Sequence, residues 1–221
     1  MIKVHYLENS QAIRIVWLLE ELGLDYEIKL YKRDKTTKLA PEDFKKLHPF
    51  GTSPLVEMDG KVIAETNAII DYILDRQSQQ PLRPEKNSES YEKYNFWFHA
   101  SQASLMPMLF TSFLFHKVTT SVPFFLKPIL EAVSKKIHTI ILSPRTDRIL
   151  FLLNQDLGKG PWLCGEELSA ADIVLGYSLK VAEARVGLSN FANCRKFIEN
   201  MEKREAYQRA LERVGGFSTN L

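Results

Sequence analysis

Three short polar stretches in the first third of the chain carry residue types that could bind a peptide and an anion together. They are Asn9-Ser10, Ser53-Pro54 and Glu65-Thr66, and each directly precedes or opens a predicted helix or strand. A helix N-terminus presents free amide donors and the positive end of its dipole to an anion. Because proline has no backbone donor, Pro54 at the opening of a strand indicates a sheet edge that no neighbouring strand covers.

The chemistry of these residues predicts what such an edge would hold. If the bond before Pro54 is cis, the backbone N–H and C=O of Ser53 face outward and can pair with an extended peptide. The Glu65 carboxylate could accept an ammonium group, and Thr66 with the amides of its helix could take a carboxylate. A zwitterionic amino-acid end on a short peptide backbone fits this pattern.

The elements that must position these residues begin with a strand, a helix and a second strand. Residues 2–7 and 25–31 alternate apolar and polar side chains, as strands do. Residues 9–23 carry apolar side chains on one helical face, with Asn9 or Ser10 as the cap and Gly23 as the terminator. Two parallel strands joined by such a helix form a right-handed crossover.

The next elements complete a small mixed sheet. Residues 41–47 predict a short helix with a proline in its first turn. Residues 54–64 predict a hairpin, because Asp59-Gly60 between two apolar alternations is a strong signal for a two-residue turn. A helix over residues 66–76 follows, so the order is strand, helix, strand, helix, two strands and helix. We expect helices on both faces of this sheet.

The second part of the chain is predicted to be entirely helical. Residues 79–88 are polar and contain two prolines, which indicates a linker between residues 1–78 and residues 89–221. Amphipathic helical patterns then continue to the end of the chain. The stretch "LSAAD" has the spacing of a capping box, with Ser169 as N-cap and Asp172 at the third helical position, and we assign it to stability.

Composition and charge describe an ordinary globular protein. Of the 221 residues, 45% are hydrophobic, and 29 Lys and Arg residues face 27 Asp and Glu residues. The overall charge therefore gives no reason to expect nucleic acid or an anionic membrane as the main partner. A local basic cluster over residues 29–38 is interpreted first as a solvated loop and second as a site for a small anion.

Several classes of site and location are disfavoured. Cys164 and Cys194 are too few and too far apart for a disulfide framework, and the five histidines show no metal-ligand spacing. The start "MIKVHYL" lacks the pattern of a secretory signal. Proline and lysine interrupt the apolar runs "LMPMLFTSFLF" and "VPFFLKPIL" well short of a membrane span. We expect a cytoplasmic protein with no metal and no membrane span.

The whole chain resembles a cytosolic glutathione transferase, of the fungal and bacterial theta-like branch that uses a serine. The resemblance lies in three blocks, which are "NSQAIRIVWLLEELGLDYE", "HPFGTSPLVEMDGKVIAET" and "GPWLCGEELSAADIVLGYSL". It implies a thioredoxin-like domain over residues 1–78, an all-α domain over residues 89–221, glutathione as cosubstrate and a homodimer. The second block resembles the family's glutathione signature, with Glu65-Thr66 in place of Glu-Ser.

The resemblance also implies roles for individual residues. Ser10 lies in "SQAIR", which resembles the block around the catalytic serine, and Asn9 is the alternative donor to the thiolate. A thiol with a pKa of about 8.5 needs roughly 2.7 kcal/mol of anion stabilisation to lower its pKa by ~2 units. A charge-assisted hydrogen bond of about 1.5–3 kcal/mol at a helix N-terminus could supply it. Ser10 can equally serve only as a helix cap.

The binding residues are assigned in the same way. The resemblance places glutathione against Thr52, Ser53, Pro54, Glu65 and Thr66. More weakly, it suggests Lys38 for the glycyl carboxylate and Gln102 across a dimer interface, although packing is the expected use of Gln102. A hydrophobic electrophile would lie near Phe98, Met106 or Phe110, although aromatic side chains at helical spacing are more often core.

Two functions follow from these expectations. The first is conjugation of the glutathione thiolate to a small hydrophobic electrophile, and the same thiolate could also reduce organic hydroperoxides. The second is a non-catalytic binding or dimerisation module, because the same fold also serves in that way. An open hollow beside Ser10 would favour the enzyme, and a blocked hollow would favour the module.

Overall fold

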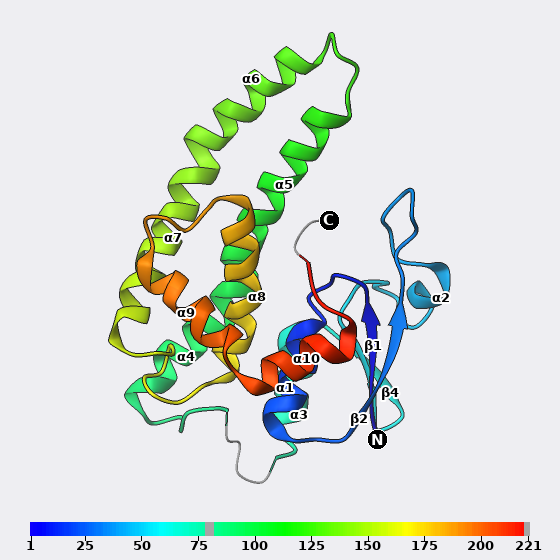
Figure 1. Ribbon diagram of the computed structural model, residues 1–221, viewed down its shortest axis with the longest axis vertical. Helices are drawn as coiled ribbons and strands as arrows, with labels where there is room; N and C mark the ends of the chain where they lie inside the picture. Colours follow the sequence, from blue (N-terminus) through cyan, green and yellow to red (C-terminus); the bar gives the residue numbers. More distant parts are fainter. Residues whose placement is uncertain (78–81, 219–221) are drawn as a thin grey trace.

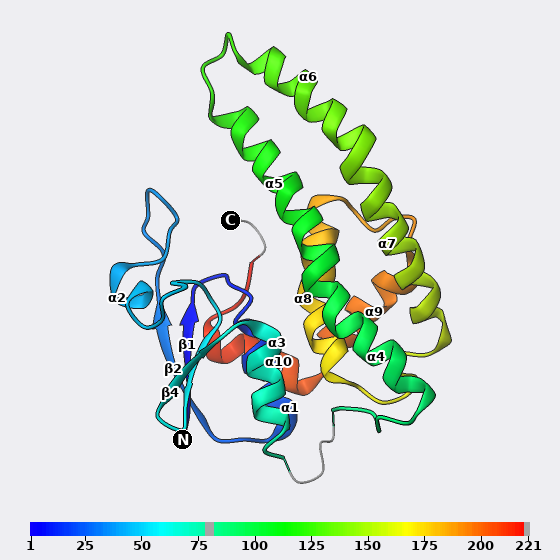
Figure 2. The same cartoon turned by 180° about the vertical axis from the view of Figure 1, so that it is seen from behind.

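The computed structural model describes residues 1–77 and 82–218. A small sheet with its helices forms one part, and a group of longer helices forms the other (Figure 1). Figure 2 shows the same two parts from behind, with α3 beside the sheet and the long helices standing away from it. This arrangement confirms the predicted fold class, an α/β part followed by an all-helical part.

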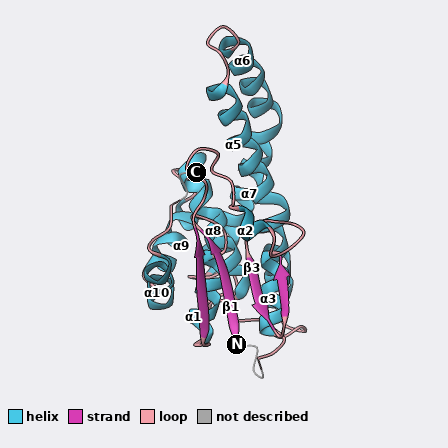
Figure 3. Ribbon diagram, turned by 90° about the vertical axis from the view of Figure 1, so that its right-hand side faces the viewer, coloured by secondary structure: helices cyan, strands magenta, loops and turns pink. Residues whose placement is uncertain are grey.

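The sheet has four strands in the order β2-β1-β3-β4. β1 (Ile2–Leu7) pairs in parallel with β2 (Tyr26–Tyr31), and α1 (Ile13–Leu22) makes the crossover between them. β1 also pairs antiparallel with β3 (Leu55–Met58), which forms a hairpin with β4 (Lys61–Ala64). The predicted strands and their order along the chain are confirmed, and Figure 3 shows the strands side by side.

The hairpin turn has the conformation that its two residues favour. Asp59 and Gly60 both have positive φ, 53° and 70°. A two-residue turn with two left-handed positions matches the twist of the flanking strands. The Asp-Gly prediction is therefore confirmed, and the turn fixes the register that pairs Leu55 with Ala64.

Helices cover both faces of the sheet, as expected. α1 and α3 (Thr66–Leu74) pack on one face and contribute to the main core. The short α2 (Glu42–Lys45), whose N-cap is Pro41, covers the other face. There Phe44 packs into a separate small core, whose buried members are Leu7, Tyr31, Phe44 and Leu55.

α1 begins later than the sequence predicts. Its first residue is Ile13, and residues 8–12 form turns that connect it to β1. The Ser10 hydroxyl accepts a hydrogen bond from the Ala12 N–H at 3.3 Å, so it does stabilise the approach to the helix. Gly23 ends the helix in the left-handed conformation, as predicted.

The second part of the chain is helical throughout its described residues. α4, α5 and the segment between them form one continuous rod, and α6 and α7 are joined in the same way. Both joining segments are π-helical. The elements are α4 (Glu89–Ala100), η1 (Ser101–Leu105), α5 (Met106–Ser121), α6 (Lys127–Ile137), η2 (His138–Leu142), α7 (Ser143–Asp156), the 3₁₀ turn η3 (Leu157–Lys159), α8 (Ala170–Arg185), α9 (Ala192–Glu202) and α10 (Glu205–Val214).

The two parts share one hydrophobic core. α8 and α10 pack against α1, and the buried Trp17 ring lies edge-on to Tyr207. Gly176 of α8 faces this contact, and a Cβ there would collide with Met201 Sδ and lie 3.0 Å from the Trp17 ring. Glycine at this position therefore permits the close approach of α8 to α1.

α8 begins at the predicted capping box. The Ser169 side chain and the Asp172 carboxylate each bond the other's backbone. Asp172 is fully buried and also accepts the Leu163 N–H at 2.8 Å. The box therefore fixes both the start of α8 and the loop that precedes it.

The junction between the two parts is only partly described. α3 ends at Leu74 and α4 begins at Glu89. Of the predicted linker 79–88, residues 79–81 lie outside the described residues, as does residue 78, so the division into residues 1–78, 79–88 and 89–221 stays a prediction. None of the helices within 1–77 and 82–218 has the length and apolar character needed to cross a bilayer.

Candidate active site

Ser10 and Ser53 meet at the edge of the sheet. Their hydroxyl oxygens are 2.8 Å apart, and Ser10 is 4% exposed. The turn after β1 carries Ser10, and the segment that leads into β3 carries Ser53. Ser10 Oγ also accepts a hydrogen bond from the Ala12 N–H. When Ser53 is the donor in the bond between the two hydroxyls, the hydroxyl proton of Ser10 is available to bond a third group.

The third predicted stretch lies at the same edge. Leu55 pairs with Ala64, so the residues just outside this pair, Pro54 and Glu65, are neighbours across the two strands. The Ser53–Pro54 peptide bond is cis. The three polar stretches that the sequence singled out therefore converge beside one end of β1 and β3.

A cavity of about 480 Å³ opens beside Ser10, between the two parts of the chain. Six of the predicted site residues line it. Those from the first part are Asn9, Ser10, Thr52 and Ser53, and those from α5 are Met106 and Phe110. Phe113, Tyr177 and Val181 extend its apolar wall. The hollow is open, with a polar side on the sheet and an apolar side on the helices.

Phe98 does not line this cavity, which corrects the sequence-based expectation. Its ring is buried and stacks on Tyr94 with ring centroids 5.4 Å apart. Its carbonyl accepts a hydrogen bond from Asn67 Nδ2 at 2.7 Å. Phe98 thus connects α4 to α3 in the core, where its ring is enclosed by other side chains instead of lining the cavity.

Glu65 and Thr66 lie at the edge of the sheet but do not line the described cavity. Glu65 is exposed and has φ = 73°, a left-handed conformation that costs a non-glycine residue free energy. Thr66 is buried, and its Oγ1 has no hydrogen-bond partner among the described residues. Glu65 is the N-cap of α3 and Thr66 its first residue, so both lie at the N-terminus of that helix.

The basic residues at the cavity differ from the one predicted. Lys38 is exposed and does not line it, and its carbonyl accepts a hydrogen bond from Arg33 Nη1 at 3.1 Å. Arg33 and Lys45 line the cavity on the sheet side, and Arg185 lines it on the helical side. The basic run 29–38 was the signal that could have found Arg33, whereas nothing local marked Lys45 or Arg185.

Arg14 is a buried cation directly below the cavity. It is 1% exposed, and within residues 1–77 and 82–218 no carboxylate pairs with it. Its guanidinium donates to Gln11 Oε1 at 2.9 Å and to Ser178 Oγ at 2.9 Å, and it lies 4.4 Å from the centre of the Tyr177 ring. Burial lowers the pKa of Arg14 to about 9, so the group stays charged at neutral pH.

Gln11 and Gln102 connect Arg14 to the serine pair. Gln102 Oε1 accepts from Arg14 Nη1 at 2.7 Å, and Gln102 Nε2 donates to Gln11 Oε1 at 2.7 Å. Gln11 Nε2 then donates to the Ser53 carbonyl at 3.1 Å. Gln102 is therefore engaged with its own chain, and its role across a dimer interface stays a prediction.

The alternative donor Asn9 and two polar residues of β1, Tyr6 and His5, have different environments from Ser10. Asn9 lines the cavity with φ = 49°, but its Oδ1 accepts the Ser218 N–H at 3.0 Å. Tyr6 is buried away from the cavity, and burial raises the pKa of its hydroxyl far above the usual range. His5 is also buried and its Nδ1 lies 3.0 Å from the Tyr31 hydroxyl. Ser10 is therefore the best-placed hydroxyl among these groups.

The protein's own thiols are unsuited to nucleophilic chemistry at neutral pH. Cys164 and Cys194 are free, and burial raises the pKa of Cys164 to about 11 and that of Cys194 to about 12. Neither lines the cavity. Within the described ranges no group of three histidine, cysteine, aspartate or glutamate residues could hold a metal ion.

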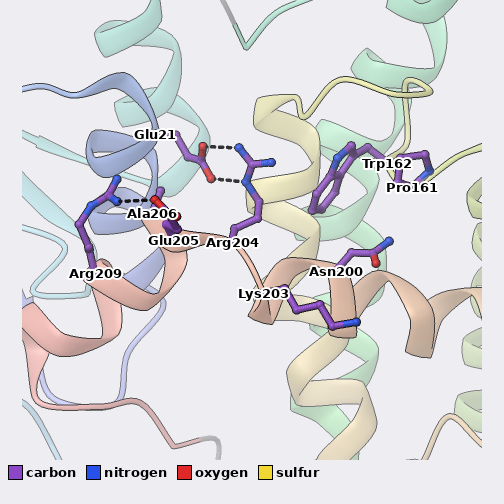
Figure 4. Close-up of a pocket in the computed structure, with 9 residues that line it drawn as sticks. All are labelled: Glu21, Pro161, Trp162, Asn200, Lys203, Arg204, Glu205, Ala206 and Arg209. Atoms are coloured by element: carbon purple, nitrogen blue, oxygen red, sulfur yellow. Dashed lines mark hydrogen bonds and ion pairs between the residues drawn. The ribbon is translucent and has the colours of Figure 1, made fainter.

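A second hollow, of about 580 Å³, lies on another face of the molecule (Figure 4). The Arg204 guanidinium and the Glu21 carboxylate form two hydrogen bonds there, both 2.6 Å long. The Trp162 ring lies 5.4 Å from the centre of the Arg204 guanidinium. Because its charges are paired between α1 and the segment before α10, we interpret this hollow as part of the junction between the two parts.

Comparison with known proteins identifies the class that this fold and cavity define. Residues 1–75 match the glutathione S-transferase N-terminal domain, and residues 105–205 match the C-terminal domain. Glutathione S-transferase 3 of Schizosaccharomyces pombe is 33% identical over 216 residues, which cover 97% of this chain and 88% of that protein. Glutathione S-transferase 1 of Saccharomyces cerevisiae is 29% identical over 230 residues, covering 100% and 98%.

Comparison with solved structures indicates the same family. A glutathione S-transferase from Actinobacillus pleuropneumoniae superposes with a TM-score of 0.79 at 31% identity, covering 98% of this chain and 94% of that one. The chain belongs to the glutathione S-transferase family. It is a transferase whose cosubstrate is glutathione, as the resemblance of its three sequence blocks indicated.

Proposed function

We propose that Ser10 ionises the glutathione thiol and that the cavity beside it holds the reacting pair. The observation that carries this proposal is the position of Ser10 Oγ, at the wall of the cavity and 2.8 Å from Ser53 Oγ. With Ala12 N–H and Ser53 Oγ directed at it, the Ser10 hydroxyl is polarised to donate its own proton outward. A thiolate placed there would receive a charge-assisted hydrogen bond.

The sheet edge is proposed to hold the rest of the tripeptide. The backbone of Ser53 pairs with the cysteinyl residue, with Thr52 and Pro54 on either side. Glu65 accepts the γ-glutamyl ammonium, and Thr66 with the amides of α3 takes its carboxylate. Arg33 and Lys45 are proposed for the glycyl carboxylate in place of Lys38, because both line the cavity.

The helical wall is proposed to bind a small hydrophobic electrophile. Met106, Phe110 and Phe113 present apolar surface within the same cavity as Ser10. The thiolate attacks the electrophilic carbon and forms the new C–S bond. Either a leaving group departs with its bonding electron pair, or the π bond of an activated alkene breaks and the neighbouring carbon takes up a proton. Reduction of an organic hydroperoxide to its alcohol, with two glutathione thiols oxidised to a disulfide, is proposed as a second reaction of the same thiolate.

The finer cellular and quaternary assignments are also proposals. We infer a cytoplasmic homodimer in which exposed apolar residues of α4 and α7, such as Phe96 and Phe151, lie at the interface. The free cysteines are compatible with a reducing compartment. A non-catalytic module is disfavoured because the hollow beside Ser10 is open.

The test is retention on immobilised glutathione followed by a conjugation assay of the parent and of Ser10→Ala. We expect both chains to be retained, and we expect kcat/KM of the variant to fall by about 100-fold, the loss typical of removing one donor to a developing anion. Retention of the variant with unchanged turnover would move the role to Asn9. Failure of the parent to bind would favour the non-catalytic module.

A further inference from the structure

A hairpin formed by α5 and α6 projects far from the rest of the molecule (Figures 1 and 3). We call residues 106–137 the α5–α6 hairpin, and residues 122–126 its tip. α6 buries none of its residues, and α5 buries only Leu109 and Thr119. The run "VPFFLKPIL" lies within the hairpin, as does all of "LMPMLFTSFLF" except its first residue, Leu105. Neither the core nor the cavity accounts for its outer half.

The outer half of the hairpin exposes large apolar side chains. At the tip, Phe124 is 87% exposed and Phe125 is 62% exposed. On α6, Ile129 is 63% exposed and Val133, four residues later, is also exposed. On α5, Val118 is half exposed. Large exposed apolar side chains gathered on one projecting segment are uncommon on a monomer and indicate a site that something else covers.

The charges around these apolar residues have one predominant sign. Lys117, Lys127, Lys135 and Lys136 are all exposed on the hairpin. Glu131 is its one acidic residue, and its carboxylate lies 3.9 Å from Lys127. Although the whole chain is nearly balanced in charge, this part of it is clearly basic. Exposed aromatic residues flanked by lysines are typical of a segment that lies in a lipid interface.

We propose that the tip of the α5–α6 hairpin docks on an anionic lipid surface. Phe124 and Phe125 enter the boundary between headgroups and acyl chains, and Lys117 and Lys127, the lysines nearest the tip in the sequence, contact the lipid phosphates and carboxylates. Lys135 and Lys136 add to the positive charge of the hairpin. A second copy of the chain is the weaker occupant. In a symmetric pair these lysines would have to meet a different, acidic patch of the second copy, whereas an anionic lipid surface complements them directly.

The hairpin also connects the tip to the cavity. Phe110, Leu114 and Val118 follow one another at intervals of four residues and therefore share a face of α5. Phe110 lines the cavity, and Leu114 and Val118 are exposed between it and the tip. Apolar electrophiles dissolved in a bilayer would then be close to the active site. This consequence rests on the proposed function, whereas the docking itself does not.

The test is sedimentation of the full chain with lipid vesicles. One set contains phosphatidylcholine alone, and the other contains phosphatidylcholine mixed with phosphatidylserine. We expect binding to the second set only, weakened by added salt, and reduced at least about tenfold in the double variant Phe124→Ser, Phe125→Ser. The matched control is Leu30→Ser, Val186→Ser, which removes exposed apolar residues from β2 and from the end of α8 and should sediment like the parent.

Two further measurements separate the alternatives. Conjugation of a water-soluble electrophile without vesicles should be equal in the parent and in the Phe124→Ser, Phe125→Ser variant, which shows that the variant is folded. This assay also tests the proposed function independently of lipid. The proposal is overturned if the parent does not bind anionic vesicles, or if the Phe124→Ser, Phe125→Ser variant binds them as well as the parent. It is also overturned if this variant differs from the parent in the mass measured by light scattering, because the tip would then contact a second copy of the chain.

Discussion

At the scale of single residues, Arg14 is a buried charge whose burial is unfavourable but which supports the site through its hydrogen bonds. Removing a guanidinium from water is unfavourable unless its donors are satisfied. Arg14 places its charge among neutral acceptors, which are Gln11, Gln102 and Ser178. Its Nε has no partner among the described residues. The fold therefore holds a buried positive charge one hydrogen-bonded residue, Gln11, away from Ser53, beside which the proposed mechanism forms the thiolate.

Replacing Arg14 should weaken glutathione binding more than it weakens the fold. In Arg14→Leu, Gln11 loses its anchor and no longer fixes the Ser53 carbonyl, to which it donates at 3.1 Å. We expect the KM for glutathione to rise about tenfold, which corresponds to ~1.4 kcal/mol. Steady-state kinetics and chemical denaturation would measure both effects, with exposed Arg195→Leu as the control. An unchanged KM would show that Arg14 has only a packing role.

His5 should make stability depend on pH. Burial lowers the pKa of His5 below its ordinary value of 6.5, and this effect outweighs the nearby Glu57 carboxylate, 3.6 Å from Nε2. As the pH falls below about 6.5, His5 takes up a proton more readily in the unfolded chain than in the folded chain. The free energy of unfolding therefore falls. The free energy of unfolding, measured by urea denaturation, should decrease less between about pH 7.5 and about pH 5.5 in His5→Gln than in the parent. Equal drops would contradict this account.

The sequence singled out Ser10 and Ser53 one by one, and Arg33 as part of a basic cluster, but it did not mark Lys45 or Arg185. Ser10 and Ser53 are marked by local signals, a helix start and a proline before a strand, and these signals act over a few residues. Lys45 and Arg185 reach the cavity only because distant segments fold together, and no local pattern specifies that. Phe98 was misplaced because helical spacing shows that a residue faces some neighbour, without showing which one.

At the scale of elements, the start of α8 depends on the Ser169 and Asp172 capping box. Ser169 Oγ lies 2.6 Å from Asp172 Oδ2, and both side chains are buried. Ser169→Ala should lower the free energy of unfolding by about 1–2 kcal/mol. Ser88→Ala is the matched control, because Ser88 is the N-cap of α4 without a capping hydrogen bond, and it should cost less than about 0.5 kcal/mol. Equal losses in the two variants would refute the assignment.

Elements were predicted more reliably than their boundaries. The Asp-Gly turn, the crossover helix and the capping box each rest on contacts within one element or between neighbours, and the structure confirms them. α1 starts three residues after Ser10 because the turn at residues 8–12 carries the chain from β1 to the helix. Side-chain pattern alone does not show where such a turn ends.

At the scale of the whole molecule, α1 and the segment before α10 are held together by charge as well as by apolar contact. Glu21 is nearly buried and accepts two hydrogen bonds from Arg204 (Figure 4). It also accepts one from Trp17 Nε1. Removing Arg204 would leave this carboxylate poorly compensated. The sequence showed two parts of different class, but it did not show which side chains join them, since the partners are 183 residues apart.

Arg204→Met should therefore destabilise the chain by about 1–3 kcal/mol. Glu21→Gln in the same background should recover part of the loss, because the unpaired charge is then absent. A double-mutant cycle measured by denaturation would give this coupling energy. Additive losses from the two substitutions would indicate that the pair does not hold the two parts together.

The pKa of the thiol of glutathione bound to the parent and to Ser10→Ala tests the central claim most directly, and ultraviolet absorbance of the thiolate as a function of pH would measure it. We predict a value of about 6.5 in the parent, roughly two units below the free thiol, and a rise of at least about one unit in Ser10→Ala. Glutathione bound by Ser10→Ala with the same thiol pKa as in the parent would contradict the claim that the Ser10 hydroxyl stabilises the thiolate.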